Sequence, residues 1–408
     1  MDIAFQRIDK LMTGITALTG DHPAQSLQLL RATSGACRVE FLLQALPIGS
    51  VSADTARMAR DRLKQGLCAV LHREDLPRDA WEQAIIPTRL GGLGLRDPTL
   101  IHYAARFSSL LSAKSLALEM GASEWYVERE PFLAKSAYER FLQVQVPTDT
   151  RPSKELQAQL TEPIYQRMWT ALVDRTPSDD KKRLLSVSTS HATSWTLDSP
   201  LIPVMLPGEY YCGLLWILGL SFREGAYICP DCGKPADPKG IHATTCQRSG
   251  AITIGHNKLQ YTVGTLYEWA EYSVEYETPV ILGGEERRPA DLLVHGLASR
   301  PTAIDFTAVT TVRASASSST TSLLDEAALR KTRENLAPCA QAGWLCSHFV
   351  TDTYGALHQQ ARAMISSLIA RRATTLSPKP AATVGRKVWS SVSPLPHTLL
   401  FPQLRVTP

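Results

Sequence analysis

The chain has 408 residues, with 43 lysines and arginines against 39 aspartates and glutamates, which gives a formal net charge of +4. Its apolar fraction of 44% and charged fraction of 20% are those of a globular protein, and they exclude a wholly disordered or collagen-like chain. At roughly 100–200 residues per domain, the length suggests two to four domains. A charge of +4 is too small to identify a nucleic-acid binder, so any basic surface must be local.

The N-terminus lacks the basic segment and long apolar core of a secretory signal. The longest apolar run, residues 210–222, is well short of the roughly 20 residues that cross a bilayer, and it predicts a buried helix. Eight cysteines in a chain of this length do not make a disulfide scaffold. We therefore expect a soluble intracellular protein with no membrane contact.

Helical patterns dominate the first part of the chain. Residues 1–125 show apolar side chains at helical spacing, and Asp97 before Pro98 is an expected start of a long helix. The preceding segment 85–98 (IIPTRLGGLGLRDP) contains glycines and a proline that force a turn. Residues 126–225 are a mostly helical linker region with polar breaks at 146–153 and 176–182.

The composition changes near residue 226. A cysteine cluster occupies residues 226–254, and a helix and short β-branched segments follow over 255–373. Residues 374–408 are rich in Pro, Ser and Thr and predict a tail with little structure of its own. The sequence therefore predicts an α+β protein in which a helical N-terminal region precedes the cysteine cluster and a small α/β domain.

The strongest local signal is a cluster of four metal-ligand residue types within 18 positions: Cys229, Cys232, His242 and Cys246. Two cysteines two residues apart form a knuckle that offers two thiolates to one ion, and the His and Cys can complete a tetrahedral site. Zinc is the natural ion, with a structural role because no coordination position stays open. The alternative is a CxxC beside an unrelated His and Cys, and His256 is the second choice for the nitrogen ligand.

An amphipathic helix and a hairpin follow the cluster. Apolar residues between 259 and 274 recur at steps of three or four, which predicts a helix of about 18 residues. Two apolar runs then flank a turn-rich segment, which predicts a β-hairpin. Because side chains alternate along a strand, Asp305 and Thr307 would share one face, and Ile304 and Phe306 the other.

Asp291 and Asp305 lie on the two strands of this hairpin. An acid within an apolar strand costs stability unless it is paired or binds a cation. Two carboxylates on neighbouring strands suit Mg²⁺, a hard ion that favours oxygen ligands and substrate phosphates. Such an ion would activate water for attack on a phosphodiester. The alternative is that both aspartates merely end their strands at the turn.

The order of these motifs resembles a known family. A CxxC-H-C knuckle, an HN dipeptide that opens a helix, a Glu, a Pro-Ala-Asp and an Asp-x-Thr occur in this order in the C-terminal part of certain non-LTR retrotransposon polyproteins. That part resembles the restriction-like endonuclease domain of site-specific elements, which belongs to the PD-(D/E)XK nuclease superfamily. The resemblance implies that a zinc knuckle is followed by a small α/β domain with a mixed sheet. The segment 85–98 also resembles the stretch after the reverse transcriptase in such proteins. The resemblance spans roughly residues 20–370.

The resemblance implies a role for each matching residue. The four cluster residues would be the zinc knuckle, and Asp291 and Asp305 would bind the catalytic Mg²⁺. Glu277 would be an auxiliary acid. Thr307 stands where the superfamily often has its lysine, and Lys331 on the following helix could reach back in its place; the alternative for Lys331 is a solvated helix lysine.

The sequence departs from the family in two further ways: it lacks one nucleic-acid contact residue and it lacks the polymerase motif. Gly255 replaces the arginine that usually precedes the HN dipeptide, His256-Asn257, which removes one phosphate contact. No aromatic-x-Asp-Asp strand of a polymerase is present, and Asp179-Asp180 is expected in a polar loop. We therefore expect no reverse transcriptase activity, and a truncated element or a derived gene that would need a reverse transcriptase in trans.

Basic and aromatic residues near the acidic hairpin are candidate nucleic-acid contacts. A DNA partner would meet a basic group consisting of Arg287, Arg288, Arg313, Arg330, Lys331 and Arg333. The alternative is a set of solvated charges. Trp269, Tyr272 and Tyr276 could stack on bases, although core packing is the commoner use.

The expected function is Mg²⁺-dependent nicking of DNA in the nucleus, with RNA as a second candidate partner. The alternatives are a catalytically inactive nucleic-acid-binding protein and a degenerate element fragment.

Overall fold

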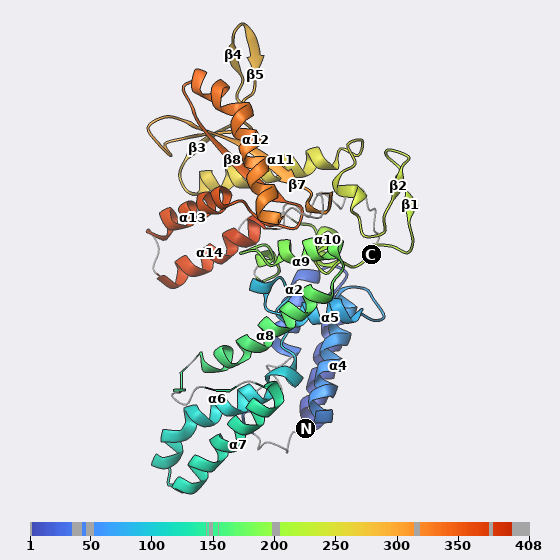
Figure 1. Cartoon of the computed structure of the whole chain (residues 1–408), viewed down its shortest axis with the longest axis vertical. Helices are drawn as coiled ribbons and strands as arrows, with labels where there is room; N and C mark the ends of the chain where they lie inside the picture. The colour runs from blue at the N-terminus through green and yellow to red at the C-terminus, as the bar shows by residue number, and fades with distance from the viewer. Residues whose placement is uncertain are drawn as a thin grey trace. The chain divides into compact units, whose positions relative to one another are not determined.

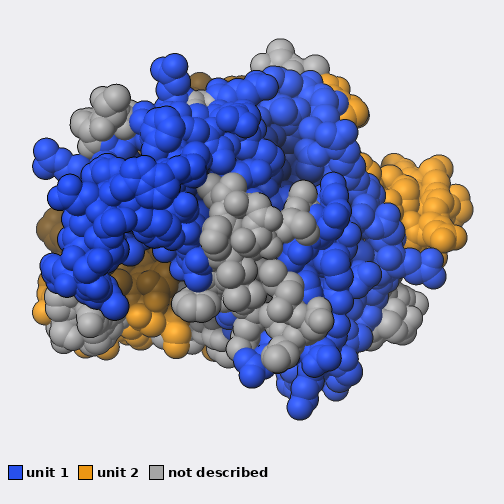
Figure 2. All heavy atoms as spheres, turned by 90° about the horizontal axis from the view of Figure 1, so that it is seen from below, with its two compact units in different colours: residues 1–87, 93–175 blue, residues 88–92, 176–408 orange. Residues whose placement is uncertain are grey.

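The structure, a computed structural model, describes residues 2–34, 43–45, 53–143, 145–146, 150–153, 155–197, 205–313, 319–374 and 378–393. The chain forms two compact units (Figure 2). The first comprises residues 1–87 and 93–175, and the second residues 88–92 and 176–408. The junction at residues 175–176 falls inside the region predicted as a helical linker, 126–225.

The described part of the first unit is helical, as its apolar spacing predicts. One small core gathers around Phe5, Ile8 and Ile101, and another around Phe107 and Tyr138. Its helices are α1 (Asp2–Leu18), α2 (Pro23–Leu29), α4 (Ala53–Val70), α5 (Arg78–Ile85), α6 (Pro98–Glu119), α7 (Glu124–Leu142) and α8 (Leu156–Arg175).

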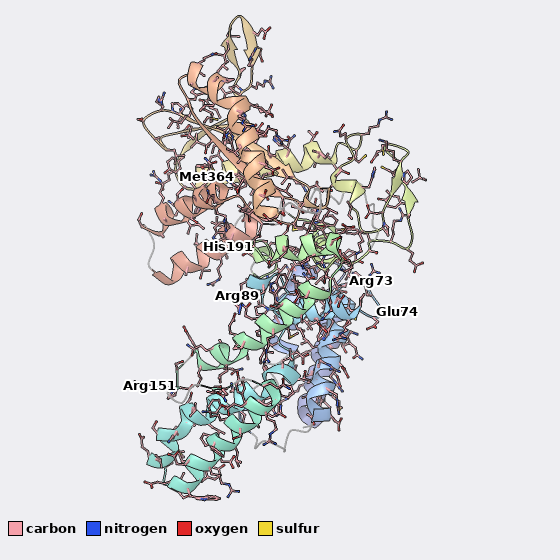
Figure 3. The ribbon with its side chains drawn as sticks, in the orientation of Figure 1. Arg73, Glu74, Arg89, Arg151, His191 and Met364 are labelled. Atoms are coloured by element: carbon pink, nitrogen blue, oxygen red, sulfur yellow. The ribbon has the colours of Figure 1, made fainter. Side chains whose placement is uncertain are left out.

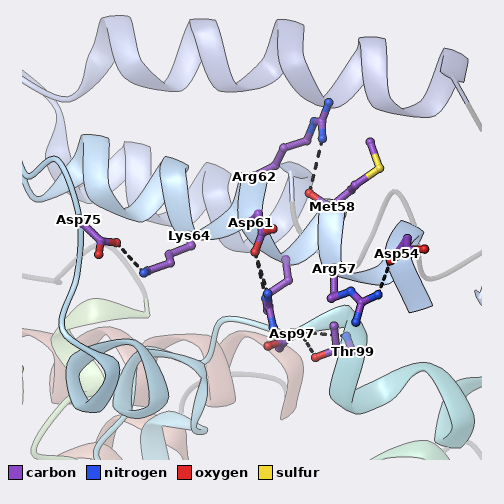
Figure 4. Close-up of polar contacts among 10 residues, drawn as sticks. Asp54, Arg57, Met58, Asp61, Arg62, Lys64, Asp75, Asp97 and Thr99 are labelled. Atoms are coloured by element: carbon purple, nitrogen blue, oxygen red, sulfur yellow. Dashed lines mark hydrogen bonds and ion pairs between the residues drawn. The ribbon is translucent and has the colours of Figure 1, made fainter. Parts of the chain in front are cut away.

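The start of α6 is fixed by its predicted cap. The Asp97 carboxylate accepts hydrogen bonds from the Thr99 amide (2.8 Å) and the Thr99 hydroxyl (2.7 Å), which satisfies donors that a helix start leaves unpaired (Figure 4). Nearby, Lys64 of α4 pairs with Asp75. These contacts are exposed or local, so burial of the apolar faces supplies most of the stability of this unit.

The second unit combines helices with all the strands of the described residues (Figure 1). Helix α10 is buried over almost its whole length, as predicted, but it begins at Pro207 and ends at Ile217, whereas the prediction extended to residue 222. Among the described residues, no helix combines the length and apolarity needed to cross a bilayer. The helices are α9 (Ser178–Val187), α10 (Pro207–Ile217), α11 (Ala251–Trp269), α12 (Thr320–Gln341), α13 (Gln359–Ala373) and α14 (Pro378–Val392).

The loop expected around Asp179-Asp180 is instead helical, which corrects the sequence prediction. Helix α9 begins at Ser178 and carries both aspartates in its first turn. Carboxylates are favourable there because the amide groups of a helix start carry a partial positive charge. A local electrostatic preference therefore explains these two acids.

The sheet is mixed, as predicted. Its order is β3 (Ser273–Tyr276), β6 (Leu292–His295), β7 (Thr302–Val309) and β8 (Leu345–Asp352). Strands β6 and β7 form the predicted antiparallel hairpin, and β8 runs parallel to β7 after the chain crosses over through α12. A separate hairpin consists of β4 (Val280–Leu282) and β5 (Glu285–Arg287).

The two faces of β7 lie in different environments, as the alternation of side chains along a strand predicts. Ile304 and Phe306 are buried in a core shared with α11, α13 and α14. On the other face, α12 packs against β8 through Ala328 and Val350. Asp305 alternates with Ile304 and Phe306 and therefore points to the α12 side, where its partners are found.

The prediction of a loose tail over residues 374–408 is wrong for the residues that the structure describes. Residues 378–392 form α14, whose Val388, Trp389 and Val392 are buried in the core of the second unit. The two prolines at its start are tolerated because the first helical turn has no internal partners for its amides. The high proline content therefore masked an apolar stripe at helical spacing. Residues 394–408 lie outside the described residues.

A buried acid at the end of β8 makes the stability of the second unit dependent on pH. Asp352 is fully buried, and its Oδ1 accepts hydrogen bonds from the amides of Tyr354 and Ala356, both at 2.8 Å. Burial raises the pKa of Asp352 to about 6, from 3.8. Because the folded state holds this proton more tightly than the unfolded state, stability falls as pH rises from about 4 through about 6.

Replacing Asp352 by asparagine should remove this pH dependence. Two pKa units correspond to about 3 kcal/mol, so the free energy of unfolding of wild type should drop by that order relative to D352N between pH 4 and 7.5. Denaturant titrations of both proteins at several pH values measure the difference. A difference that stays constant over this range would contradict the prediction.

Candidate metal centre and acidic site

The cysteine cluster is built on a minimal hairpin. Strands β1 (Tyr227–Ile228) and β2 (Pro235–Ala236) pair, and between them the Gly233 amide donates to the Cys229 carbonyl (2.9 Å). Gly233 has φ +71°, a conformation that favours glycine, and so closes the turn that carries Cys229 and Cys232. The Asp237 carboxylate accepts the His242 amide (2.7 Å) and fixes the start of the 3-10 turn His242–Thr244.

The four predicted ligands converge. Their ligand atoms all lie within 4.8 Å of one another, with 3.9 Å between the Sγ atoms of Cys229 and Cys246 and 3.3 Å between Cys232 Sγ and His242 Nε2. Zn–S bonds of about 2.3 Å and Zn–N bonds of about 2.0–2.1 Å give tetrahedral edges of roughly 3.5–3.8 Å. The four residues are therefore close enough to bind one metal ion, consistent with zinc.

The apolar core of this segment is small. Its apolar cluster consists of Cys229, Ala236 and Cys246, with Tyr227 and Cys232 packed against them. Three of these five side chains are the ligands themselves. The candidate metal ligands thus supply most of the apolar core of the knuckle, so the folding of this segment would depend on a bound ion.

The knuckle is anchored to elements around it. The Phe222 amide donates to the Pro238 carbonyl (2.8 Å), and Lys239 pairs with Asp180 of α9 (2.8 Å). Helix α11 begins at Ala251, five residues after Cys246. The knuckle therefore sets where α11 starts, and α11 carries the next group of functional candidates.

The first acid of the site, Asp291, lies directly before β6 and is held by two donors. The Phe306 amide donates to its Oδ2 (2.7 Å), and His256 Nε2 lies 3.2 Å from the same atom. Burial alone would raise the pKa of Asp291, but the hydrogen bonds from His256 and Phe306 outweigh it and lower that pKa. The same contact raises the pKa of His256.

The second acid, Asp305, faces α12. The Nζ of Lys331 lies 3.0 Å from Asp305 Oδ2, an ion-pair distance, and the Asp305 side chain is 13% exposed. That buried oxygen has no aligned hydrogen-bond donor among the described residues. Burial and the neighbouring charge of Asp291 raise the pKa of Asp305. The two carboxylates thus act on each other, and Lys331 contacts Asp305 from α12.

Other predicted residues lie at the edge of this site. The Glu277 amide donates to the Asp291 carbonyl (2.9 Å), whereas the Glu277 carboxylate pairs with Arg288 (3.2 Å). Arg288 also pairs with Glu286 (3.5 Å), and Arg287 pairs with Glu285 (3.2 Å). Arg287 and Arg288 are therefore fully compensated by the acids around them.

The remaining basic candidates differ in their surroundings. Arg330 lies 3.9 Å from Glu334, and Arg333 is exposed on α12. Arg313 ends a 3-10 turn, and its side chain lies outside what the structure describes. Asn257 is exposed on α11, next to His256.

The aromatic residues of α11 and β3 are used for packing. Trp269 and Tyr272 pack against the core of the second unit, and the guanidinium of Arg371 covers the Tyr272 ring at 4.4 Å. The Tyr276 ring packs directly over Gly264, where an added Cβ would meet the Tyr276 hydroxyl at 2.2 Å and displace the ring. These contacts favour core packing over base stacking.

Two residues of the site were not predicted. Gln260 of α11 donates its amide to the Asp291 carbonyl, one helical turn after His256. His348 of β8 is the strand neighbour of Asp305 and contacts Thr332 of α12 (3.0 Å). The four-residue spacing of His256 and Gln260 was a usable signal, whereas His348 depends on a parallel pairing that the sequence does not display.

Comparison of the chain with models of known protein families and with curated proteins finds no match.

Proposed function

We propose that this chain is a retrotransposon-derived DNA endonuclease that hydrolyses phosphodiesters with Mg²⁺ and nicks a target site. The observation that carries the proposal is the meeting of Lys331 with Asp305 at 3.0 Å, beside Asp291. These residues come from three separate segments and match the acids and lysine that the resemblance implies. A set of strand-ending aspartates would not need a lysine from a distant helix.

The acidic pair suits a divalent cation. Asp305 Oδ2 is buried without an aligned donor, and burial together with the adjacent Asp291 charge raises the Asp305 pKa. A cation between the two carboxylates would offset the free-energy cost of keeping Asp305 ionised. Asp291 and Asp305 would hold Mg²⁺ through carboxylate oxygens. When bound, the ion would make water more acidic and offset charge on the phosphodiester.

The other residues have separate tasks in this proposal. Lys331 would orient the attacking water or stabilise negative charge on the phosphate, because its ammonium already faces Asp305. His256 would hold Asp291 in position, and Asn257 beside it would contact the DNA backbone. Glu277 would assist only after its carboxylate leaves Arg288.

The knuckle and the parent element suggest the biological setting. A zinc knuckle next to α11 would place nucleic acid near the acidic site. In the parent elements, a nick of this kind opens a nuclear target site to prime reverse transcription. Here the reverse transcriptase would come in trans, with RNA as a second nucleic-acid partner.

A supercoiled-plasmid nicking assay tests the proposal. Purified wild type should convert plasmid to the open circle with Mg²⁺ and not with a chelator, and Asp291→Ala and Asp305→Ala should not. Asp325→Ala, which removes an exposed carboxylate of α12, is the matched control and should nick like wild type. The proposal fails if wild type nicks no more than the two site variants.

An inactive nucleic-acid-binding protein is the second candidate. The Glu277–Arg288 pair and the threonine at position 307 favour it, since both depart from an assembled nuclease site. Binding of the plasmid without nicking, by wild type and by both aspartate variants alike, would support this candidate. If the protein neither binds nor nicks the plasmid, the remaining explanation is a degenerate element fragment without either function.

A further inference from the structure

We propose that Cys339 and Cys346 form a redox-active thiol pair, which a hydroperoxide converts to a disulfide and an external dithiol restores. Cys339 lies in the last turn of α12, Cys346 is the second residue of β8, and both are free thiols. Neither belongs to the knuckle or to the acidic pair. The inference goes beyond the proposed function, because the thiols react whether or not the chain cleaves DNA.

The turn between α12 and β8 brings the two cysteines together. The Trp344 amide donates to the Cys339 carbonyl (2.8 Å), and the Gly343 amide donates to the Ala340 carbonyl (3.1 Å). These are the two bonds of a Schellman cap, and Gly343 has the left-handed conformation that the cap requires, with φ +76°. The chain therefore reverses within a few residues, and β8 returns along α12 (Figure 3, orange part of the ribbon).

The two thiols are in contact but differ in accessibility. They share a small apolar cluster with Ala290, Leu293 and Ala303, and the Cys339 thiol donates a hydrogen bond to the Cys346 sulfur. Cys339 is 1% exposed, whereas Cys346 is only half-buried. A small oxidant can therefore reach Cys346 first, with Cys339 directly behind it.

The surroundings of Cys346 favour its thiolate, which is the form that attacks peroxides. The hydrogen bond from Cys339 lowers the pKa of the Cys346 thiol, and so does the His348 ring, whose Nε2 lies 3.8 Å from Cys346 Sγ; together they outweigh burial. Thr332 of α12 contacts the same ring nitrogen at 3.0 Å and holds the ring in place. Cys339 keeps its proton, because the contact with Cys346 and burial raise its pKa.

The oxidation balances in two steps. The Cys346 thiolate attacks one oxygen of the hydroperoxide and the O–O bond breaks, so that Cys346 becomes a sulfenic acid and the other oxygen leaves as hydroxide or alkoxide and is protonated. The Cys339 sulfur then attacks the sulfenic sulfur, the S–S bond forms, and the sulfenic OH leaves with the Cys339 proton as water. Two electrons thus pass from the two sulfurs to the peroxide. A dithiol reverses the second bond by thiol–disulfide exchange and is itself oxidised.

Peptide mapping of the full wild-type chain tests the inference. Trypsin should release residues 334–362 as one peptide, in which Cys339 and Cys346 are the two cysteines. When reduced native protein is exposed to hydrogen peroxide, denatured with iodoacetamide and digested, this peptide should lack the mass of two hydrogens and carry no alkyl group. Dithiothreitol before alkylation should restore the doubly alkylated peptide. Cys212, a fully buried thiol of α10, is the internal control and should be alkylated in every sample.

Two variants separate the steps. Cys339→Ser should stop at the sulfenic acid of Cys346, which dimedone traps. Cys346→Ser should leave Cys339 alkylated after peroxide, because Cys339 is buried. The disulfide of wild type should also form on the order of tenfold faster in native protein than in protein unfolded in urea, since only the fold activates Cys346.

Three results would overturn the inference. One is a doubly alkylated peptide 334–362 after peroxide, and another is a disulfide that joins either cysteine to a cysteine outside this peptide. The third is an equal rate of disulfide formation in native and unfolded protein, which would show that the pair reacts only because it is close in sequence. Plasmid nicking enters none of these measurements, so failure of the proposed function would leave the outcome unchanged.

Discussion

Replacing Lys331 by alanine is expected to lower the rate of Mg²⁺-dependent plasmid nicking by about 10²–10³, the usual cost of removing one charge-stabilising donor from a catalytic site. Its Nζ lies 3.0 Å from Asp305 Oδ2, and the Lys331 side chain is 23% exposed. The loss leaves the buried Asp305 charge without its cation partner. The variant should therefore also shift the metal concentration needed for half-maximal activity.

Arg300→Ala is the matched control for this experiment, since Arg300 is an exposed arginine in the turn between β6 and β7 and lies outside the basic group expected to meet DNA. It should change the nicking rate less than about threefold. Lys331→Arg should recover part of the rate because the positive charge is kept. Equal nicking rates for wild type and Lys331→Ala would show that this lysine is a solvated helix residue with no role in catalysis.

Replacing Cys246 by serine is expected to release the metal ion of the knuckle and unfold residues 227–246. Three of the five side chains in the small apolar cluster of the knuckle are ligands, so little remains to hold the segment once the ion leaves. Structural zinc sites contribute on the order of 10 kcal/mol to the folding of such segments. Metal content should fall from about one ion per wild-type chain to near zero, and limited proteolysis should cut within the knuckle.

Cys212→Ala provides the control, because Cys212 is a fully buried thiol of α10 outside the cluster. Its metal content should equal that of wild type even if its melting temperature falls. Nicking should also decrease in Cys246→Ser, since α11 begins five residues after Cys246 and carries His256. Wild-type protein that binds no zinc, or Cys246→Ser protein that keeps it, would contradict the prediction.

The sequence was informative wherever the signal was short-range. The spacing of Cys229, Cys232, His242 and Cys246 fits within one compact loop, and the structure brings all four together. Alternation along β7 placed Ile304 and Phe306 in the core and Asp305 on the opposite face. Patterns of this kind need only the period of a strand or the reach of a knuckle, which the chain carries locally.

The two predictions that were wrong failed for different physical reasons. Proline content suggested a tail from residue 374, but Val388, Trp389 and Val392 of α14 bury against the core of the second unit. Tertiary burial of one apolar stripe outweighs a composition that disfavours order. The loop expected at Asp179-Asp180 failed because acids at a helix start are stabilised by the backbone amides.

By itself, the sequence determined the ligands of the knuckle, the hairpin and its inward face, and the order of acids and lysine. Only the tertiary structure decided which of these residues meet. His256 reaches Asp291 because α11 packs under the sheet, and Lys331 reaches Asp305 because α12 covers the other face. These contacts between distant segments depend on which faces of the helices and the sheet are buried against each other, and that is decided by the packing of the whole unit.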